Sequence, residues 1–227
     1  MWRRLIGRDD EGRTLFRDRE ATGKALALLL TERGVEADLV LAIPRGGLEV
    51  AEPVARCFAL PLDVLVSRKV GAPDQPELAL GSVTRLGAVW NEEVLDARRI
   101  SAETQARLSR AERDEVERRE RAFRGVRAAE PVDGRRVLLV DDGLATGATA
   151  AAAVQAGLAA GAAEVVVAVP LAPRETVARL ERLGAEVVAV VTPEPFGAVG
   201  AFYEDFRAVP HERCIEILRR YTSAPVN

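Results

Sequence analysis

The stretch VLLVDDGLATGAT, residues 137–149, decides how this chain folds. Its apolar start ends in the paired acids Asp141 and Asp142, and two glycines then lead into an alanine-rich segment. Such a pattern is typical of a buried parallel strand that turns into a helix. The turn would present successive backbone N–H groups and a helix N-terminus, which together favour a phosphate group. The stretch therefore predicts an α/β fold with an anion site beside two carboxylates.

The sequence on either side repeats this alternation between short β-branched runs and alanine-rich segments. Alternation of this kind predicts a central, mostly parallel sheet flanked by helices. Ligand groups are expected at the carboxyl ends of its strands, because crossover connections leave a crevice there. The expected strands are residues 39–43, 62–67, 136–141, 164–169 and 186–191.

Residues 75–125 interrupt this alternation. Residues 78–83 and 88–91 predict an antiparallel hairpin, and Ser101 is suited to cap a long helix that ends at Gly125. Acids placed four residues before arginines recur along this helix, so we expect it to be exposed and to need little contact with the core. A mobile lid, an oligomer arm and a solvated connector are the alternative interpretations.

The composition limits the kinds of partner. The formal charge of -3 arises from 32 basic and 35 acidic side chains that are interspersed, so neither nucleic acid nor a membrane surface is an expected partner. Cys57 and Cys214 lack metal-binding spacing, which indicates a reducing compartment and buried structural thiols. The N-terminus lacks the apolar run of a signal peptide. We therefore expect a cytoplasmic protein.

Residues 137–149 resemble the signature of type I phosphoribosyltransferases that binds phosphoribosyl pyrophosphate (PRPP), in which an apolar strand, paired acids and A-T-G-x-T follow one another. Other phosphate motifs fit poorly, because a P-loop requires GxxxxGK[ST] and a dinucleotide site requires GxGxxG. The resemblance implies the type I phosphoribosyltransferase fold, with Asp141 and Asp142 as catalytic residues that bind the ribose hydroxyls. The residues implied to wrap the 5-phosphate are Ala145, Thr146, Gly147, Ala148 and Thr149.

The same resemblance implies a reaction. The 5-phosphoribosyl group would pass from PRPP to a small nitrogenous acceptor, with a nucleobase favoured, and pyrophosphate would leave, as in nucleotide salvage. Mg²⁺ is the implied cofactor, bound through PRPP with Asp141 and Asp142 nearby. A regulatory protein that senses PRPP or a nucleotide in the same pocket, with little catalytic activity, is the alternative.

A second segment, IPRGG at residues 43–47, resembles the pyrophosphate loop of the family. It follows an expected strand and opens an expected helix, so it offers both backbone N–H groups and a cation. The resemblance implies that Arg45, Gly46 and Gly47 bind pyrophosphate, and we expect a cis peptide bond near Arg45. A plain Pro-Arg-Gly-Gly turn is the alternative.

The third expected strand ends in two further cations, Arg68 and Lys69. By resemblance they would also contact pyrophosphate, with Lys69 as a catalytic residue. The loop at residues 71–76 would close over the reaction and exclude water. A solvated basic strand end is the alternative interpretation.

Residues 193–209 hold four of the ten aromatic residues of the chain. By resemblance this segment forms a small hood that binds the acceptor through Phe196, Val199 and Tyr203, since aromatic rings stack on bases. Rings that only seal an apolar flap are the alternative. Ala145 stands where hypoxanthine-guanine members carry an acid, which disfavours that group.

We expect one domain over residues 1–227, with a flexible lid hairpin and an inserted helix at residues 75–125 and the hood at residues 193–209. The polar inserted helix makes a homodimer a further expectation. His211, the sole histidine, is expected at the surface at the start of the last helix.

Overall fold

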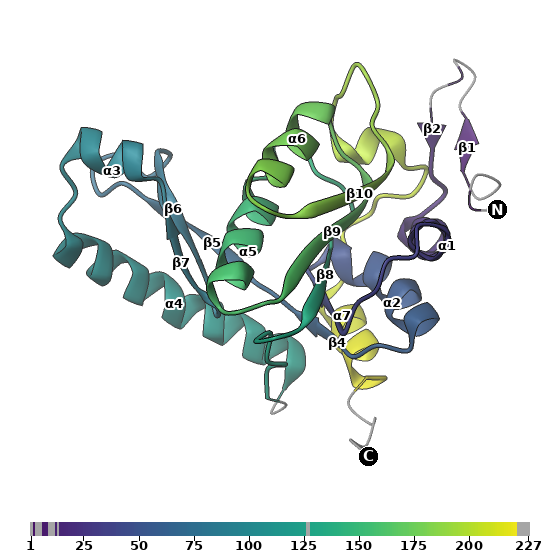
Figure 1. Ribbon diagram of the computed structural model, residues 1–227, viewed down its shortest axis with the longest axis horizontal. Coiled ribbons are helices and arrows are strands. Elements are labelled where there is room, and N and C mark those ends of the chain that lie inside the picture. The colour runs from purple at the N-terminus through teal and green to yellow at the C-terminus, as the bar shows by residue number, and fades with distance from the viewer. Residues whose placement is uncertain (1, 3–5, 9–11, 13, 126–127, 222–227) are drawn as a thin grey trace.

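A five-stranded parallel sheet lies at the centre of the computed structural model, which describes residues 2, 6–8, 12, 14–125 and 128–221 (Figure 1). The strands run in the order β10, β9, β8, β3, β4. Every neighbouring pair is parallel, which confirms the predicted sheet. The bounds of its strands are β3 Leu39–Ala42, β4 Leu62–Val64, β8 Arg136–Val140, β9 Glu164–Leu171 and β10 Glu186–Val191.

Helices cover both faces of this sheet. Helices α1 and α2 pack on the face that carries Leu138 and Val140, and α5 and α6 pack on the face that carries Val137 and Leu139. Side chains alternate between the two faces of a strand, and burial on both faces explains why these strands are almost wholly apolar. The bounds are α1 Arg19–Glu32, α2 Gly46–Phe58, α5 Ala148–Ala159 and α6 Arg174–Arg182.

A second, antiparallel sheet and two helices form an arm, residues 67–124, that extends to the left in Figure 1. Its strands run in the order β5, β6, β7, and the pairing of β6 with β7 confirms the predicted hairpin. The strand predicted at residues 62–67 is two strands, because β4 ends at Val64 and Ser67 begins β5 of the second sheet. The bounds are β5 Ser67–Gly71, β6 Ala79–Thr84, β7 Gly87–Trp90, α3 Glu92–Arg98 and α4 Ala102–Arg124.

The inserted helix α4 is packed on the body over its C-terminal half, so the expectation of little core contact was wrong. Val116 is fully buried and Phe123 is 9% exposed, and both join the core formed by α1 and α2. Glu120 is 1% exposed and accepts the Val66 N–H at 3.0 Å. Spacing along the helix could not reveal this, because the partners of Glu120 come from distant segments.

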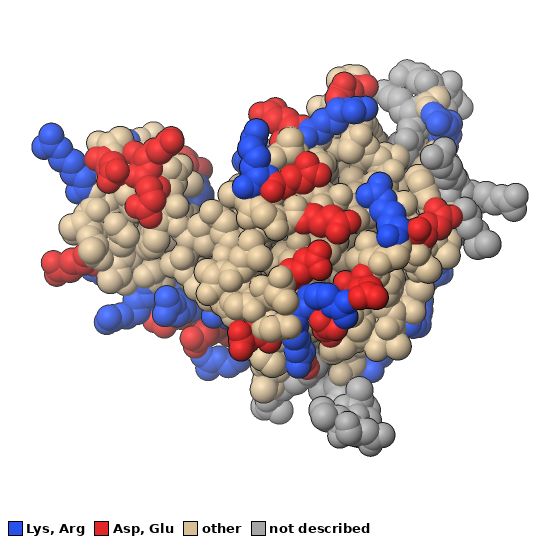
Figure 2. Space-filling model, viewed as in Figure 1, with Lys and Arg blue, Asp and Glu red and all other residues tan. Residues whose placement is uncertain are grey.

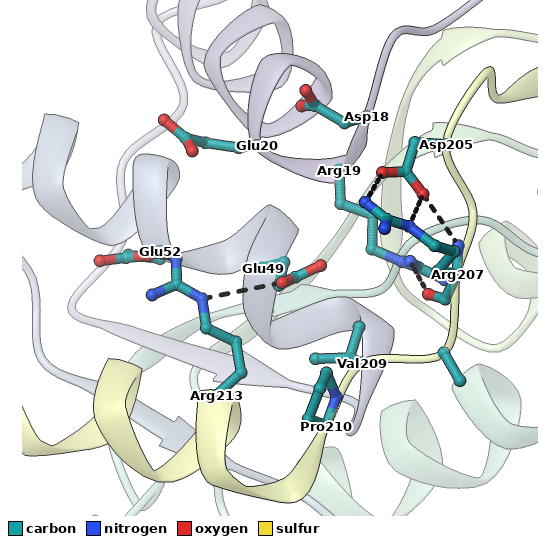
Figure 3. A pocket seen from close by; sticks show the side chains of 11 residues that line it. Asp18, Arg19, Glu20, Glu49, Glu52, Asp205, Arg207, Val209, Pro210 and Arg213 are labelled. Atoms are coloured by element: carbon teal, nitrogen blue, oxygen red, sulfur yellow. Dashed lines mark hydrogen bonds and ion pairs between the residues drawn. The ribbon is translucent and has the colours of Figure 1, made fainter.

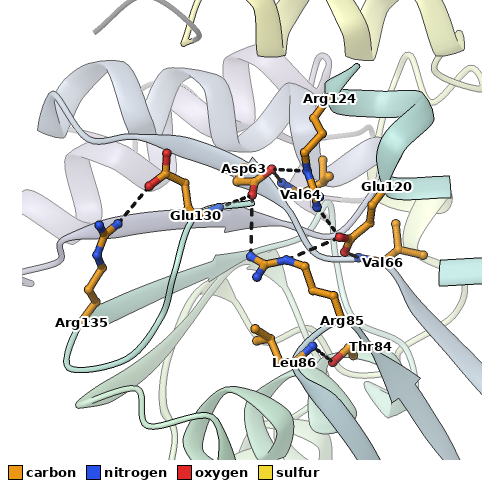
Figure 4. Close-up of polar contacts among 10 residues, drawn as sticks. All are labelled: Asp63, Val64, Val66, Thr84, Arg85, Leu86, Glu120, Arg124, Glu130 and Arg135. Carbon is orange, nitrogen blue, oxygen red and sulfur yellow. Dashed lines mark hydrogen bonds and ion pairs between the residues drawn. The ribbon is translucent and has the colours of Figure 1, made fainter. Parts of the chain in front are cut away.

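Four charged side chains lock the inner end of the arm to the parallel sheet (Figure 4). Arg124 Nε lies 3.3 Å from Asp63 Oδ1, and Arg124 also pairs with Glu120. Arg85, from the turn between β6 and β7, lies 3.7 Å from Asp63 and 3.5 Å from Glu120. Separating these side chains would leave buried charges without partners, which is strongly destabilising. The cluster therefore fixes α4 in place.

The remaining elements precede α1 or follow β10 in the chain. The bounds are β1 Gly7–Arg8, β2 Thr14–Leu15, the 3-10 helix η2 Val199–Phe202 and α7 His211–Arg219. Phe16 bridges Tyr203, so the segment before α1 lies beside the predicted hood. Helix α7 packs between α2 and α4. Among the described residues, no helix combines the length and apolar character needed to cross a bilayer.

The two thiols have different surroundings. Cys214 is fully buried on α7 beside the Arg45 carbonyl, and burial raises the pKa of its thiol to about 11. Cys57 is exposed near the end of α2, so the expectation of burial holds for Cys214 and is wrong for Cys57. A thiol in the last turn of a surface helix carries no pattern that marks it as exposed.

Candidate active site

A cavity of about 640 Å³ opens where β3, β4 and β8 end. It unites the segment around Arg45 with the segment around Asp141, which lie far apart in the sequence. This is the expected place, because the carboxyl ends of parallel strands meet at one edge of the sheet. Its lining residues are Ile43, Pro44, Arg45, Gly46, Val66, Ser67, Arg118, Arg119, Ala122, Phe123, Asp141, Asp142, Thr149 and His211.

The side chains of Asp141 and Asp142 are partly buried, and one nearby cation, Arg19, bonds to one of them. Asp141 Oδ1 accepts the Asp142 N–H at 2.8 Å, and Asp142 Oδ2 accepts from Arg19 Nε at 2.8 Å. Burial and repulsion from Asp142 raise the pKa of Asp141 well above its usual range. Burial also raises the pKa of Asp142, although the hydrogen bond and charge of Arg19 oppose the shift. With one guanidinium bonded to two carboxylates, as far as the described residues go, the pair can still accept hydrogen bonds from a polar ligand.

Residues 145–149 form the turn that leads from the acids into α5, and of these five residues Thr149 lines the cavity while the others lie beside it in the chain. Their N–H groups make no hydrogen bond to any residue that the structure describes. The carbonyls are held, since Thr176 Oγ1 donates to Ala145 O at 2.7 Å and Arg179 donates to Thr146 O. Gly147 has φ 62, in the left-handed region that favours glycine. The turn is thus anchored through its acceptors while its donors stay available for an anion.

The loop at residues 44–47 approaches the acids very closely. A Cβ on Gly46 would lie 1.9 Å from Asp142 Oδ2, and one on Gly47 would lie 2.8 Å from the Val140 carbonyl oxygen. Only glycine permits this approach. The peptide bond between Pro44 and Arg45 is cis, as predicted. Arg45 is exposed and lines the cavity, so the loop places a cation beside two carboxylates.

Comparison with known proteins identifies the family. The model of the family described as "Phosphoribosyl transferase domain" matches residues 19–188. The chain belongs to this family. The crystal structure of TT1426 from Thermus thermophilus is 44% identical, with a TM-score of 0.81, and the likeness covers 91% of this chain and 99% of that one.

A curated relative of this phosphoribosyl transferase domain is found in Mycobacterium tuberculosis (strain ATCC 25618 / H37Rv). It is named "Putative phosphoribosyl transferase Rv0571c" and is 42% identical over 207 residues. Those residues are 91% of this chain and 47% of the relative. The chain therefore spans about half the length of the curated relatives it matches.

Two predicted pyrophosphate residues of this phosphoribosyl transferase domain do not line the cavity. Arg68 Nε pairs with Glu112 on α4 at 2.8 Å, and Lys69 Nζ lies 3.2 Å from Glu77 Oε2. Strand β5 belongs to the arm, and both side chains form their ion pairs there, with α4 and with the loop before β6. The loop at residues 71–76 lies at the outer end of β5, where it contacts α3. The structure therefore does not bring Arg68, Lys69 or this loop to the cavity.

The predicted acceptor residues also lie outside the cavity lining. Tyr203 is 6% exposed, and its hydroxyl donates to the Asp142 carbonyl at 2.6 Å, so the ring supports the acids from behind. Phe196 packs against Phe202, with ring centroids 5.6 Å apart, and Val199 packs beside the turn that follows the acids. These contacts agree with the alternative of a sealed flap, and acceptor binding stays a prediction.

Sequence analysis missed several residues that line or support the cavity. Arg19 holds Asp142 from 123 positions away, and Arg118 and Arg119 reach the cavity from the inserted helix. His211 also lines it, with its ring 4.9 Å from that of Phe123, and it is half-buried at the start of α7, where sequence analysis placed it. No local pattern marks these residues, because each is brought to the site by tertiary packing.

A second cavity, of about 530 Å³, lies among α1, α2, α7 and the segment that follows the hood aromatics (Figure 3). Arg207 Nε donates to Asp205 Oδ1 at 2.8 Å, and Arg213 lies 3.7 Å from Glu49. Arg19 lines this cavity and extends from it to the acid pair. The lining of this cavity combines five acids with three arginines. Acidic and basic side chains are likewise interspersed on the face of the molecule that Figure 2 shows.

Proposed function

We propose that this domain transfers the 5-phosphoribosyl group from PRPP to a small nitrogenous acceptor and releases pyrophosphate. One observation supports this most strongly. The two partly buried acids, Asp141 and Asp142, adjoin a turn at residues 145–149 whose N–H groups make no hydrogen bond among the described residues. The carboxylates can accept hydrogen bonds from sugar hydroxyls, and the N–H groups can donate to a phosphate. Together they match the two ends of a single sugar phosphate.

Each part of PRPP has a proposed partner in the cavity or in the turn at residues 145–149, which reaches the cavity at Thr149. The carboxylates of Asp141 and Asp142 accept hydrogen bonds from the ribose hydroxyls, while the amides of residues 145–149 bind the 5-phosphate. Arg45 and the glycine loop bind the diphosphate. As the bond from ribose C1 to the diphosphate oxygen breaks, a bond from C1 to the acceptor nitrogen forms. The domain contributes positioning and charge stabilisation rather than a covalent intermediate.

The donor set in the cavity suits Mg²⁺ that arrives with its substrate. Among the described residues, no group of three or more His, Cys, Asp or Glu side chains is placed to hold a metal ion. Asp141 and Asp142 supply the hard oxygen donors that Mg²⁺ prefers, and a diphosphate would supply the others. When bound, Mg²⁺ would offset the charge of the departing pyrophosphate.

The test is a panel of nucleobases and other nitrogen heterocycles, incubated with PRPP and Mg²⁺ while pyrophosphate release is followed. We expect acceptor-dependent release by the unmodified chain and its loss in Asp141→Asn/Asp142→Asn. Glu117→Gln, which removes an acid from the exposed side of α4, is the matched control and should retain activity.

The panel also distinguishes the enzyme from a sensor. Binding of PRPP without release of pyrophosphate from any acceptor would contradict the transferase and favour a protein that only senses PRPP. Failure of the unmodified chain to bind PRPP would exclude both functions.

A further inference from the structure

Two arginines of the inserted helix, Arg118 and Arg119, line the same cavity as Asp141 and Asp142. We propose that Arg118 and Arg119 bind the diphosphate end of PRPP. This inference rests on the proposed function and assigns diphosphate recognition to the arm. The diphosphate would thus be bound partly by a segment that sequence analysis treats as a lid or connector.

The order of the strands decides which end of PRPP the two arginines face. The turn for the 5-phosphate follows β8, and the Arg45 loop follows β3, the next strand. Beyond β3 lies β4, which α4 contacts, so both arginines approach from the β4 side. The hood follows β10, at the opposite edge of the sheet. A ligand that spans β8 and β3 therefore extends its diphosphate toward α4 and its acceptor side toward the hood.

Glu115 holds the two guanidinium groups together. Arg118 donates to Glu115 through Nε and Nη2, both at 2.8 Å, and Arg119 Nε donates to Glu115 Oε1 at 2.7 Å. These hydrogen bonds lower the pKa of Glu115 to about 2, so it stays ionised at neutral pH. One carboxylate for two guanidinium groups leaves several N–H donors and a net positive charge on this group of three side chains. That arrangement suits an anion with many acceptor oxygens.

The helix that carries these arginines is fixed rather than mobile at this point. Val116 and Phe123 are buried on either side of them along the chain, and Glu120 and Arg124 belong to the buried ionic cluster of Figure 4. A rigid backbone lets the two side chains meet the diphosphate without ordering a loop. The packed end of α4 thus supplies the cations that sequence analysis sought at residues 68 and 69.

The test measures binding of PRPP and, separately, of inorganic pyrophosphate, each with Mg²⁺, by calorimetric titration of the full chain. The variant is Arg118→Gln/Arg119→Gln, because glutamine retains helix propensity and removes both charges. The matched control is Arg121→Gln on the same helix, which pairs with Glu117 and does not line the cavity. We expect each lost arginine to weaken both ligands about tenfold, and the control to bind like the unmodified chain.

The salt dependence gives an independent readout. If the arginines contact the diphosphate, affinity in the double variant should fall less steeply with added salt than in the unmodified chain or the control. Equal affinity and equal salt dependence in all three proteins, while PRPP still binds, would overturn this inference and leave the proposed function standing. If the double variant unfolds, the single variants decide by the same comparison. Absence of PRPP binding by the unmodified chain would overturn both.

Discussion

Two pairs of acids in this molecule differ in how many cations and hydrogen-bond donors surround them. Asp63 and Glu120 are 0% and 1% exposed, and two arginines, Arg85 and Arg124, lie between them. Backbone N–H groups of residues 64, 66 and 130 complete their hydrogen bonds. Asp141 and Asp142 line a cavity, and in the described part of the chain one guanidinium, that of Arg19, forms a hydrogen bond with this pair, to Asp142.

The difference separates a structural cluster from a binding site. Buried carboxylates are destabilising unless cations and hydrogen-bond donors compensate them. At Asp63 and Glu120, which join β4 to α4, two arginines and three backbone N–H groups offset the buried negative charge. Asp141 accepts one hydrogen bond from the residues that the structure describes, the backbone N–H of Asp142, so a ligand that donates hydrogen bonds can supply the rest. Charge compensation thus distinguishes the two pairs more clearly than burial does.

The largest effect on stability is expected from the compensated pair. Glu120→Ala leaves Arg85 and Arg124 with less counter-charge in a buried position, so the free energy of unfolding should fall by about 3 to 5 kcal/mol. Urea denaturation of the purified variant measures this change. Glu117→Ala, one turn earlier on the exposed side of α4, should stay within about 0.5 kcal/mol of the unmodified chain. Equal effects at both positions would remove the distinction between the two acid pairs.

A change of stability in the opposite direction is expected at Asp141, which has no ion pair with a described residue. A carboxyl whose pKa is raised on folding binds its proton more tightly in the folded chain, so stability falls as pH rises from the usual aspartate range through the raised pKa. Asparagine has no such proton to lose and can still accept the Asp142 N–H. Asp141→Asn should therefore raise the free energy of unfolding at neutral pH by up to about 2 kcal/mol, and the gain should shrink toward acidic pH.

The neighbouring residue provides the control for that result. Asp142→Asn removes the anionic partner of Arg19, which is 6% exposed, so this variant should not gain stability at neutral pH. Denaturation at several pH values compares the two. A destabilised Asp141→Asn would show that the acids are compensated like Asp63 and Glu120.

The smallest effect concerns the support behind the acids. Tyr203→Phe keeps the buried ring and removes the hydroxyl that donates to the Asp142 carbonyl at 2.6 Å. A loss of about 1 kcal/mol in the free energy of unfolding is expected, with PRPP affinity changed little. A large loss of acceptor affinity with unchanged stability would instead assign Tyr203 to the acceptor site.

The parts of the site that follow one strand directly could be predicted from sequence. Strand β8, its two acids and the turn into α5 are contiguous, so apolar length, paired charges and glycines specify them locally. The same holds for the loop at residues 44–47. The parallel sheet also follows, because strands buried on both faces must be almost wholly apolar.

The rest depends on packing between segments that no local pattern connects. Arg19 reaches Asp142, and Glu120 reaches Val66, only when distant elements meet. Lys69 is prominent in the sequence as one of two lysines, yet β5 carries it to Glu77 instead of the cavity. Side-chain periodicity predicts that a helix such as α4 exists. It does not predict which of its charges will find buried partners.

The most direct test of the central claim is calorimetric titration of PRPP with Mg²⁺ into the unmodified chain and into Asp141→Asn/Asp142→Asn. Two lost charged hydrogen-bond acceptors predict saturable binding by the unmodified chain and affinity weakened about 100-fold or more in the variant. Equal affinity in the two proteins, or no binding by the unmodified chain, would contradict the assignment of this cavity to PRPP.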